Sequence, residues 1–241
     1  MSDRTPTPPT RLPFSLAAGA LLVGALVVAV VFIDRANSTP PASAVSPTAT
    51  AASSASPTAV AFADCTTATF GTPLQPSGEP TNPHVYSAPP AMQIDTSKLY
   101  EATIKTARGN IVLCLQPNLA PKTVNNFVVL ARNHFYDGLT FHRVVAAFVV
   151  QGGDPAGTGN GGPGYKFNDE PVLAQYTLGA VAMANSGVNT NGSQFFICIA
   201  DDTSKLQPLY NLFGKVASGI DVASAIKQGD VMQSVTVAVQ Q

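Results

Sequence analysis

The chain has 241 residues, with 13 Lys and Arg against 14 Asp and Glu, so its formal net charge is -1. This balance excludes a basic surface for nucleic acid and an acidic tail, and we expect no polyanionic partner. The composition is uneven along the chain, which favours one smaller folded domain with N-terminal extensions.

Residues 14–33 (FSLAAGALLVGALVVAVVFI) form an unbroken apolar run. At ~1.5 Å per residue a helix of this length spans ~30 Å, the thickness of the hydrocarbon core of a membrane. The run exceeds the ~7–15 apolar residues of a cleaved signal sequence, which favours a transmembrane signal anchor. Cleavage at residues 42–44 (Ala-Ser-Ala) stays open and would give a secreted protein. Arg4 and Arg11 place residues 1–13 in the cytoplasm and the rest of the chain outside the membrane.

Two segments of low complexity follow the apolar run. Residues 34–61 are nearly all Ala, Ser, Thr and Pro, and we expect a disordered linker because they bury too little apolar surface to offset their ordering entropy. Residues 62–95 contain scattered Pro and Gly and are predicted to be an extended transition segment, packed only in part. The folded domain is expected over residues 96–241.

The domain begins with an alternating pattern, YEATIKTARGNIVLCLQ. This pattern predicts two strands joined by a turn at residues 108–110. Ile111, Leu113 and Leu115 should share one face of the second strand, and Cys114 should point to the other face.

A change of period then predicts a helix within residues 120–138. Val124, Phe127, Val128 and Ala131 stand at i, i+3, i+4 and i+7, which is typical of an amphipathic helix. Short β-like runs follow, namely LTFHRVV, FVVQGG, TLGAVAMA, SQFFICI and NLFGKV, and then a short helix near residues 219–227 and a terminal strand, SVTVAVQ. Many short strands with two helices indicate a mainly β domain, an antiparallel barrel or sandwich with helices at its ends.

The sequence contains a nucleotide-binding pattern and three histidines, but their neighbours do not support a cofactor site. Residues 157–162 match G-x-G-x-x-G, but a proline and a glycine follow where the phosphate-binding helix should begin. His84, His134 and His142 show no ligand spacing with one another or with Cys. We therefore predict no nucleotide, metal or other cofactor.

The three cysteines are an odd number for a compartment that permits disulfides. Cys198 lies in the apolar run FFICI, which favours a small buried core residue. If a bridge exists, it should join Cys65 to Cys114, because Cys114 is expected on the outward face of its strand. Such a bridge requires Cα atoms ~4.4–6.8 Å apart, which the sequence leaves open.

Three blocks carry a resemblance to a known family: FHRVVAAFVVQGGD at 141–154, MANSGVNTNGSQFFI at 183–197 and NLFGKV at 211–216. With PKTVNNF near the front, they resemble in order and spacing the signature blocks of the cyclophilin family of peptidyl-prolyl cis/trans isomerases. The resemblance covers roughly residues 96–241. It implies an eight-stranded antiparallel closed barrel capped by two α-helices, with a substrate groove on the outer face.

The resemblance also implies the roles of individual residues. Arg143 would donate a hydrogen bond to the proline nitrogen, and Gln151 would hold Arg143 and the substrate backbone. Phe148 would complete the catalytic set, and the backbone of Ala184 and Asn185 would pair with the peptide that precedes proline. The apolar proline pocket would consist of Phe148, Val149, Met183, Phe196, Leu206 and Tyr210.

Purely structural roles for the same residues remain as alternatives. Isolated aromatic residues in strands most often pack in the core, and this alternative applies to Phe148, Phe196 and Leu206. Arg143 could instead form a buried ion pair with Asp154 or Asp169, since Arg is rarely buried without such a partner.

The sequence departs from the family pattern at several places. Val149 stands where Met is usual, and Ala146-Ala147 replaces a Pro-Gly turn. Tyr210 occupies a position that is often His. The chain has no Trp, and the Trp at the rim of the family's pocket would fall near Ser204 or Lys205.

The sequence is compatible with two functions, one enzymatic and one non-catalytic. The first is a membrane-anchored foldase, a monomer whose catalytic domain lies outside the cytoplasm and accelerates Xaa-Pro isomerisation in exported polypeptides. The second is a non-catalytic module that binds proline-containing peptides at the membrane surface. Arg143 favours the enzyme, because binding an apolar proline ring needs the pocket more than the cation.

Overall fold

The computed structural model describes residues 60–78 and 82–241. The predicted signal anchor at 14–33 lies outside these residues, as does nearly all of the predicted linker at 34–61. In the described part of the chain, no helix combines the length and the apolar character that a membrane crossing requires.

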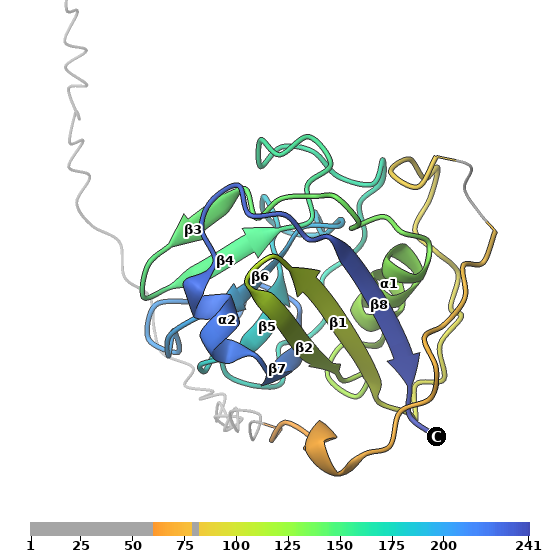
Figure 1. Ribbon diagram of the computed structural model, residues 1–241, viewed down its shortest axis with the longest axis horizontal. Helices are drawn as coiled ribbons and strands as arrows, with labels where there is room; N and C mark the ends of the chain where they lie inside the picture. Colours follow the sequence, from red (N-terminus) through yellow and green to blue (C-terminus); the bar gives the residue numbers. More distant parts are fainter. Residues whose placement is uncertain (1–59, 79–81) are drawn as a thin grey trace, which may run out of the picture. The chain divides into compact units, whose positions relative to one another are not determined.

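Eight antiparallel strands form one sheet, in the order β3-β4-β6-β5-β7-β2-β1-β8 (Figure 1). The short β-like runs of the sequence each become a strand, which confirms the mainly β prediction. The strands are β1 (Tyr100–Thr106), β2 (Gly109–Leu115), β3 (Arg143–Val145), β4 (Val149–Gly152), β5 (Ala180–Met183), β6 (Phe195–Cys198), β7 (Leu212–Ser218) and β8 (Ser234–Val239).

The sheet is a half-barrel and differs in this respect from the closed barrel that the resemblance implied. In the described residues no ladder joins β3 to β8, the two ends of the strand order. An isolated antiparallel bridge joins Thr140, shortly before β3, to Val231, shortly before β8. β3 has three residues and a largely exposed face, so it offers little backbone and little apolar surface for a second partner.

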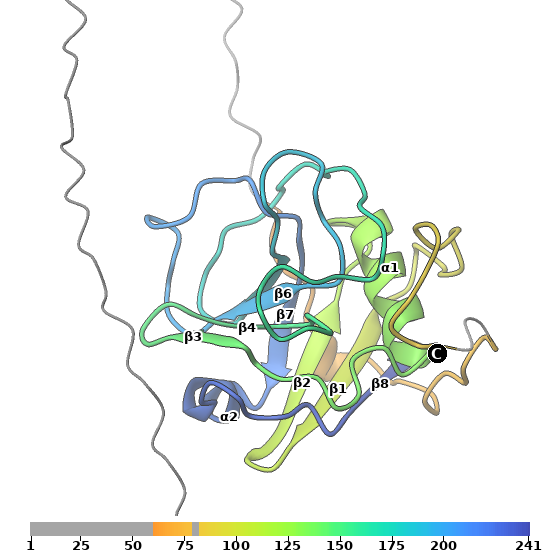
Figure 2. The same cartoon turned by 90° about the horizontal axis from the view of Figure 1, so that it is seen from above.

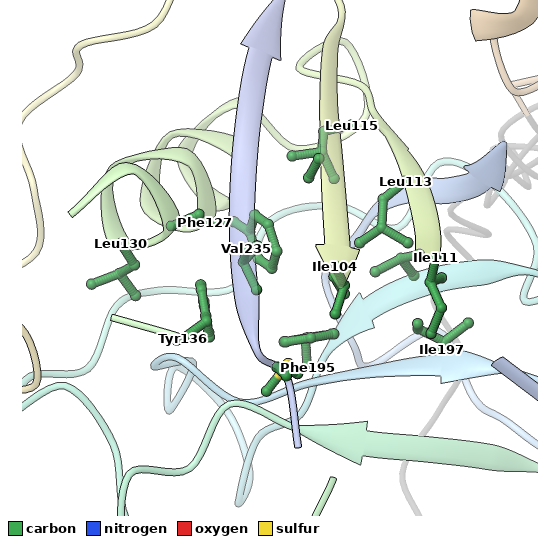
Figure 3. Packing of buried hydrophobic residues seen from close by; sticks show 14 of the residues in the cluster. Ile104, Ile111, Leu113, Leu115, Phe127, Leu130, Tyr136, Phe195, Ile197 and Val235 are labelled. Atoms are coloured by element: carbon green, nitrogen blue, oxygen red, sulfur yellow. The ribbon is translucent and has the colours of Figure 1, made fainter. Parts of the chain in front are cut away.

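The β1–β2 hairpin behaves as the alternating pattern predicts. Ile111, Leu113 and Leu115 are fully buried, while Cys114 lies on the opposite face of β2. Figure 3 shows Ile111 and Leu113 close to Ile104 of β1 and Ile197 of β6 in the interior. The inward face of this hairpin therefore supplies one wall of the larger cluster of buried apolar side chains, here called the main core.

Helix α1 (Pro121–Arg132) begins at a proline, a residue that suits the first turn of a helix. Its N-cap residue, Ala120, has no side chain that could accept a hydrogen bond from the first turn. The carboxylate of Glu170 does so instead, accepting from the backbone N–H groups of Lys122 at 2.9 Å and Thr123 at 2.8 Å. The negative charge at the helix N-terminus also suits the helix dipole.

The two helices pack on the half-barrel at different places. α1 packs against β8 and β7, and α2 (Ile220–Ala225) packs against β2 (Figure 2). The buried face of α1 carries Phe127, whose ring stacks on Tyr136 at 4.8 Å between centroids. This face is the one that the helical period predicts.

Apolar side chains on the opposite face of the sheet form a second cluster, here called the outer cluster. Its buried members are Leu119, Val149, Ala174, Tyr176, Ala180, Ala182, Phe196, Cys198 and Leu212, and Phe62, Phe148, Val172, Leu173, Ala184, Leu206 and Tyr210 pack against it. The outer cluster contains most of the predicted proline pocket.

Residues 60–78 and 82–95, here called the N-terminal strap, run beside β8 and α1 (Figure 1). Gly71 N–H donates to the carbonyl of Val239 at 3.0 Å, and Leu74 N–H donates to that of Val237 at 2.7 Å. Further on, Ser77 N–H donates to the side chain of Asn133 after α1. The strap is thus extended and hydrogen-bonded to the domain at several points.

A disulfide joins the strap to the sheet. Cys65 lies in a short 3-10 helix (Cys65–Thr67) and is bonded to Cys114 of β2, with the two Cα atoms 5.7 Å apart. Cys198 is a free, buried thiol in β6. The bridge attaches the strap to the outward face of β2.

Candidate active site

The polar centre of the site lies on the β3–β4 hairpin. Arg143 of β3 pairs in register with Gln151 of β4. Its guanidinium Nη1 donates to Gln151 Oε1 at 3.3 Å. In the next ladder Gln151 pairs with Phe196 of β6, so an arginine, an amide and an aromatic ring stand side by side across three strands.

A chain of amide hydrogen bonds orients Gln151. Its Nε2 donates to Gln194 Oε1 at 3.0 Å, and Gln194 Nε2 donates to the carbonyls of Gly159 at 2.9 Å and Gly161 at 2.8 Å. A carbonyl can only accept, so the two glycine carbonyls determine which end of the Gln194 amide faces them. The same logic then turns Gln151 Oε1 toward Arg143.

The loop that carries these two carbonyls is organised by Asp154. The buried carboxylate of Asp154 accepts hydrogen bonds from the backbone N–H groups of Ala156, Thr158 and Gly159. Burial opposes ionisation, but these donors outweigh it and lower the pKa of Asp154. Asp154 therefore acts on the site through the loop and does not contact Arg143.

Arg143 does not form the buried ion pair with Asp154 or Asp169 that the sequence left as an alternative. Arg143 is exposed, and among the described residues it forms no salt bridge. Asp169 accepts from Asn189 N–H and from Asn191 Nδ2. The arginine therefore keeps donor groups that are free to bind a ligand.

The part of the outer cluster that adjoins the arginine is here called the apolar depression, after the proline pocket that the sequence predicts. Phe148 and Leu206 are half-buried, and Val149 and Phe196 are buried. The ring of Tyr210 meets that of Phe196 edge-on, with centroids 5.5 Å apart. Five of the six residues predicted for the proline pocket thus belong to one cluster.

The buried side chain of Tyr176 holds Tyr210 in place beside this depression. Its hydroxyl donates to the carbonyl of Tyr210 at 2.7 Å and accepts from the N–H of Tyr210 at 3.0 Å. Burial raises the pKa of the Tyr176 phenol, so the hydroxyl keeps the proton that it donates. The position of Tyr210 is fixed through both of its backbone polar groups.

Met183, the sixth predicted pocket residue, lies elsewhere. It is fully buried in the main core with Val181, whereas Ala180 and Ala182 of the same strand face the outer cluster. Successive side chains of a strand point to opposite faces, so Met183 cannot reach a pocket that Ala182 faces. The structure does not bring Met183 to the site.

The backbone after β5 forms an accessible edge beside Gln151. Ala184 N–H donates to the carbonyl of Gln194 at 2.9 Å, and Asn185 Nδ2 donates to that of Leu209 at 2.8 Å. The backbone N–H and C=O of Asn185 make no hydrogen bond to any described residue. They are therefore available to an extended peptide.

A cavity of about 630 Å³ continues from this edge. It is lined by Gln151, Gln194, Ala184 and Asn185 and by residues of the glycine-rich loop 159–164. The cavity lies next to the apolar depression and shares Gln151 with the polar centre. A peptide that crosses Asn185 would thus have room on the side away from Phe148.

Two further side chains near the site have shifted pKa values. Desolvation lowers the pKa of His142, with Arg143 acting in the same direction and Asp154 opposing it, and neither ring nitrogen has a partner among the described residues. Burial raises the pKa of Cys198, which makes this thiol a poor nucleophile.

The described residues include no group of three or more His, Cys, Asp or Glu that could hold a metal.

Comparison with known proteins identifies the family of this domain. A family model described as cyclophilin type peptidyl-prolyl cis-trans isomerase matches residues 101–240, well over half of the chain. The chain belongs to the cyclophilin family. It is accordingly an isomerase that acts on peptidyl-prolyl bonds.

Bacterial relatives match over most of their own length. A Helicobacter pylori peptidyl-prolyl cis-trans isomerase is 47% identical over 145 residues, which are 58% of this cyclophilin and 88% of the relative. A Bacillus subtilis peptidyl-prolyl cis-trans isomerase B is 50% identical over 125 residues, 51% of this chain and 87% of the relative.

Solved structures share the fold of this cyclophilin. A Cryptosporidium parvum cyclophilin type isomerase has a TM-score of 0.54 and 30% identity, covering 58% of this chain and 97% of that chain. A second structure of that protein, in the presence of the dipeptide Ala-Pro, has a TM-score of 0.51 at 30% identity, covering 58% and 99%.

The structure adds two residues that the sequence of this cyclophilin did not single out. Gln194 links Gln151 to the glycine-rich loop, and Lys205 contacts the turn before Phe148. Gln194 stands two residues before Phe196 on the same face, a spacing that could have indicated it. The resemblance places the family's rim Trp near Lys205 but gives the lysine itself no role, because its contact with Ala147 joins segments far apart in the chain.

Proposed function

We propose that this cyclophilin accelerates Xaa-Pro rotation by donating a hydrogen bond from Arg143 to the proline nitrogen. The observation that supports this most directly is the exposed guanidinium of Arg143, held by Gln151 at 3.3 Å beside an apolar depression. The amide barrier of ~18–20 kcal/mol reflects conjugation of the nitrogen lone pair with the carbonyl. In the twisted amide that lone pair becomes an acceptor, so a fixed cationic donor stabilises the transition state selectively.

Arg143 alone does not supply the whole acceleration. Shortening tens of seconds to milliseconds requires about four decades in rate, or ~5.5 kcal/mol. A charge-assisted hydrogen bond contributes ~1.5–3 kcal/mol, so the apolar depression and the positioning of the substrate carbonyl supply the remainder. This mechanism requires neither a nucleophile nor a metal.

The substrate in this proposal is an extended proline-containing polypeptide. The proline ring packs against Phe148, Phe196 and Leu206, and the preceding residues pair with the backbone of Asn185. The Ala-Pro dipeptide in the structure of the Cryptosporidium parvum relative supports this substrate class. The free backbone groups of Asn185 support the binding mode.

We further propose that the substrates are exported or envelope proteins and that the enzyme acts as a membrane-anchored monomer. The apolar run at 14–33 supports the anchor. The disulfide between Cys65 and Cys114 supports a location outside the cytoplasm, since disulfides persist in oxidising compartments. Added protease should digest the domain in intact producing cells if this location is right.

The decisive test of the mechanism measures binding and turnover on the same sample. We would follow cis/trans exchange of an Ala-Pro peptide by NMR with the full chain and with Arg143→Ala. The wild-type protein should accelerate exchange, and the variant should still bind the peptide while its acceleration of exchange falls about 10- to 100-fold. Undiminished exchange in Arg143→Ala would refute the proposed role of the arginine.

A further inference from the structure

Lys205 makes three contacts at the rim of the apolar depression. Its Nζ donates to the carbonyl of Ala147 at 2.8 Å and to Asp202 Oδ1 at 2.8 Å, and it lies 5.6 Å from the centre of the Phe148 ring. The ammonium group therefore touches both the β3–β4 turn and the loop after β6. Its side chain is 48% exposed, so these contacts are made at the surface.

The first partner, Asp202, is a fully buried carboxylate. Its Oδ2 has no hydrogen-bond partner among the described residues, so Lys205 is the cation that compensates this charge. The backbone carbonyl of Asp202 accepts from the N–H groups of Lys205 and Leu206, both at 2.9 Å. Asp202 thus anchors the loop that carries Leu206 into the depression.

The second partner, the carbonyl of Ala147, belongs to a turn with an unfavourable backbone conformation. Ala147 has φ +53°, in the left-handed region that its Cβ disfavours. Phe148 N–H closes the turn by donating to the carbonyl of Val145 at 3.1 Å. The hydrogen bond from Lys205 is a long-range contact that holds this turn, and Phe148 follows directly.

From these contacts we infer that Lys205 is a positioning residue. It clamps the turn that presents Phe148 to the loop that presents Leu206, and so fixes the separation of two walls of the depression. The inference rests on the proposed function, because it takes this depression as the proline site. Without the clamp, Phe148 should sample several positions, and the proline ring should bind more weakly.

The test compares three variants of the full chain. Lys205→Met keeps the aliphatic stem and removes the ammonium, Lys205→Arg restores a cation with several donors, and Lys105→Met is the control. Lys105 is exposed on β1, and its side chain makes no hydrogen bond or ion pair to the described residues. The measurements are KM and kcat with an Ala-Pro peptide and the NMR signals of the Phe148 ring.

We expect Lys205→Met to raise KM about fivefold while kcat stays within about twofold, because a weakened site loses binding more than chemistry. The Phe148 ring signals should shift and broaden. Lys205→Arg and Lys105→Met should stay within about twofold of the wild-type KM. An unchanged KM in Lys205→Met, a loss confined to kcat, or no rescue by arginine would each overturn the clamp.

A second variant separates positioning from stability. Lys205→Met leaves the carboxylate of Asp202 buried without a cation, which could destabilise the fold. Lys205→Met with Asp202→Asn removes both charges, and it should unfold at a temperature closer to that of the wild type while KM stays raised. If the wild-type chain failed to accelerate exchange, the proposed function would fall, and the Phe148 ring signals would still decide the clamp.

Discussion

Arg143 and Gln151 face each other directly across the β3–β4 ladder, and the guanidinium donates to the amide oxygen at 3.3 Å. Replacing Arg143 by Ala should lower kcat/KM about 10- to 100-fold, the loss that corresponds to one charge-assisted hydrogen bond in the transition state. Because the side chain is exposed, the free energy of unfolding should change by less than about 0.5 kcal/mol. Kinetics and urea unfolding of the same sample measure both quantities.

Arg108→Ala is a suitable control for this variant. Arg108, in the turn between β1 and β2, pairs with Asp230 at the surface and makes no hydrogen bond to a candidate site residue. Its loss should leave kcat/KM unchanged, and an equal fall in both variants would argue against a specific role for Arg143.

A second prediction concerns Gln194, which donates to the carbonyls of Gly159 and Gly161. Gln194→Glu replaces the donating amide by a carboxylate that cannot donate to these oxygens and is repelled by them. We expect kcat/KM to fall about tenfold, because the orientation of Gln151 is lost with that of Gln194. Gln228→Glu, on the exposed segment after α2, adds the same charge and should have no effect.

A third prediction follows from His142, whose pKa is lowered from its ordinary value of 6.5 by desolvation. As the pH falls below this value, the unfolded chain takes up a proton before the folded protein does. The free energy of unfolding should therefore decrease with falling pH until the folded His142 is itself protonated. His142→Gln should remove this part of the pH dependence, as urea unfolding between about pH 5 and pH 8 would reveal. Parallel curves for the two proteins would show that His142 does not contribute.

A fourth prediction concerns the bridge between Cys65 and Cys114, which are separated by 49 residues in the sequence. Replacing both by Ser should lower the free energy of unfolding by about 2–4 kcal/mol, mainly because the unfolded chain gains freedom. Thermal unfolding measures the loss. Thiol titration of the denatured, unreduced protein provides the check: one free thiol, from Cys198, is expected, and three would exclude the bridge.

Local patterns in the sequence predict much of this fold. The alternation around Ile111 and Leu113 indicates the inward face of β2, and the 3.6-residue period around Phe127 indicates the buried face of α1. The apolar residues of these two elements recur at the period of a strand and of a helix, so the pattern carries information even though α1 is buried from Thr123 to Ala131. β5 is buried on both faces, and its apolar run could not show that Met183 faces the main core.

The site could be predicted only in part, for a related reason. Arg143, Phe148 and Gln151 lie within one hairpin, so a single sequence block brings them together. Lys205 lies 58 residues from Ala147, and the hydrogen bond between them depends on how two loops meet. The open edge of the half-barrel likewise depends on which strands pair across the chain, which no local period describes.

The hydrogen bonds of the strap to β8 have a consequence for the tendency of the folded domain to aggregate. β8 is the last strand of the sheet, with β1 on one side, and its outer backbone groups would be open to pairing with another chain. Gly71 and Leu74 occupy that edge through the carbonyls of Val239 and Val237. A fragment trimmed to the family match at 101–240 would lose these partners and leave a bare strand edge, so it should aggregate more readily than the chain that keeps its strap.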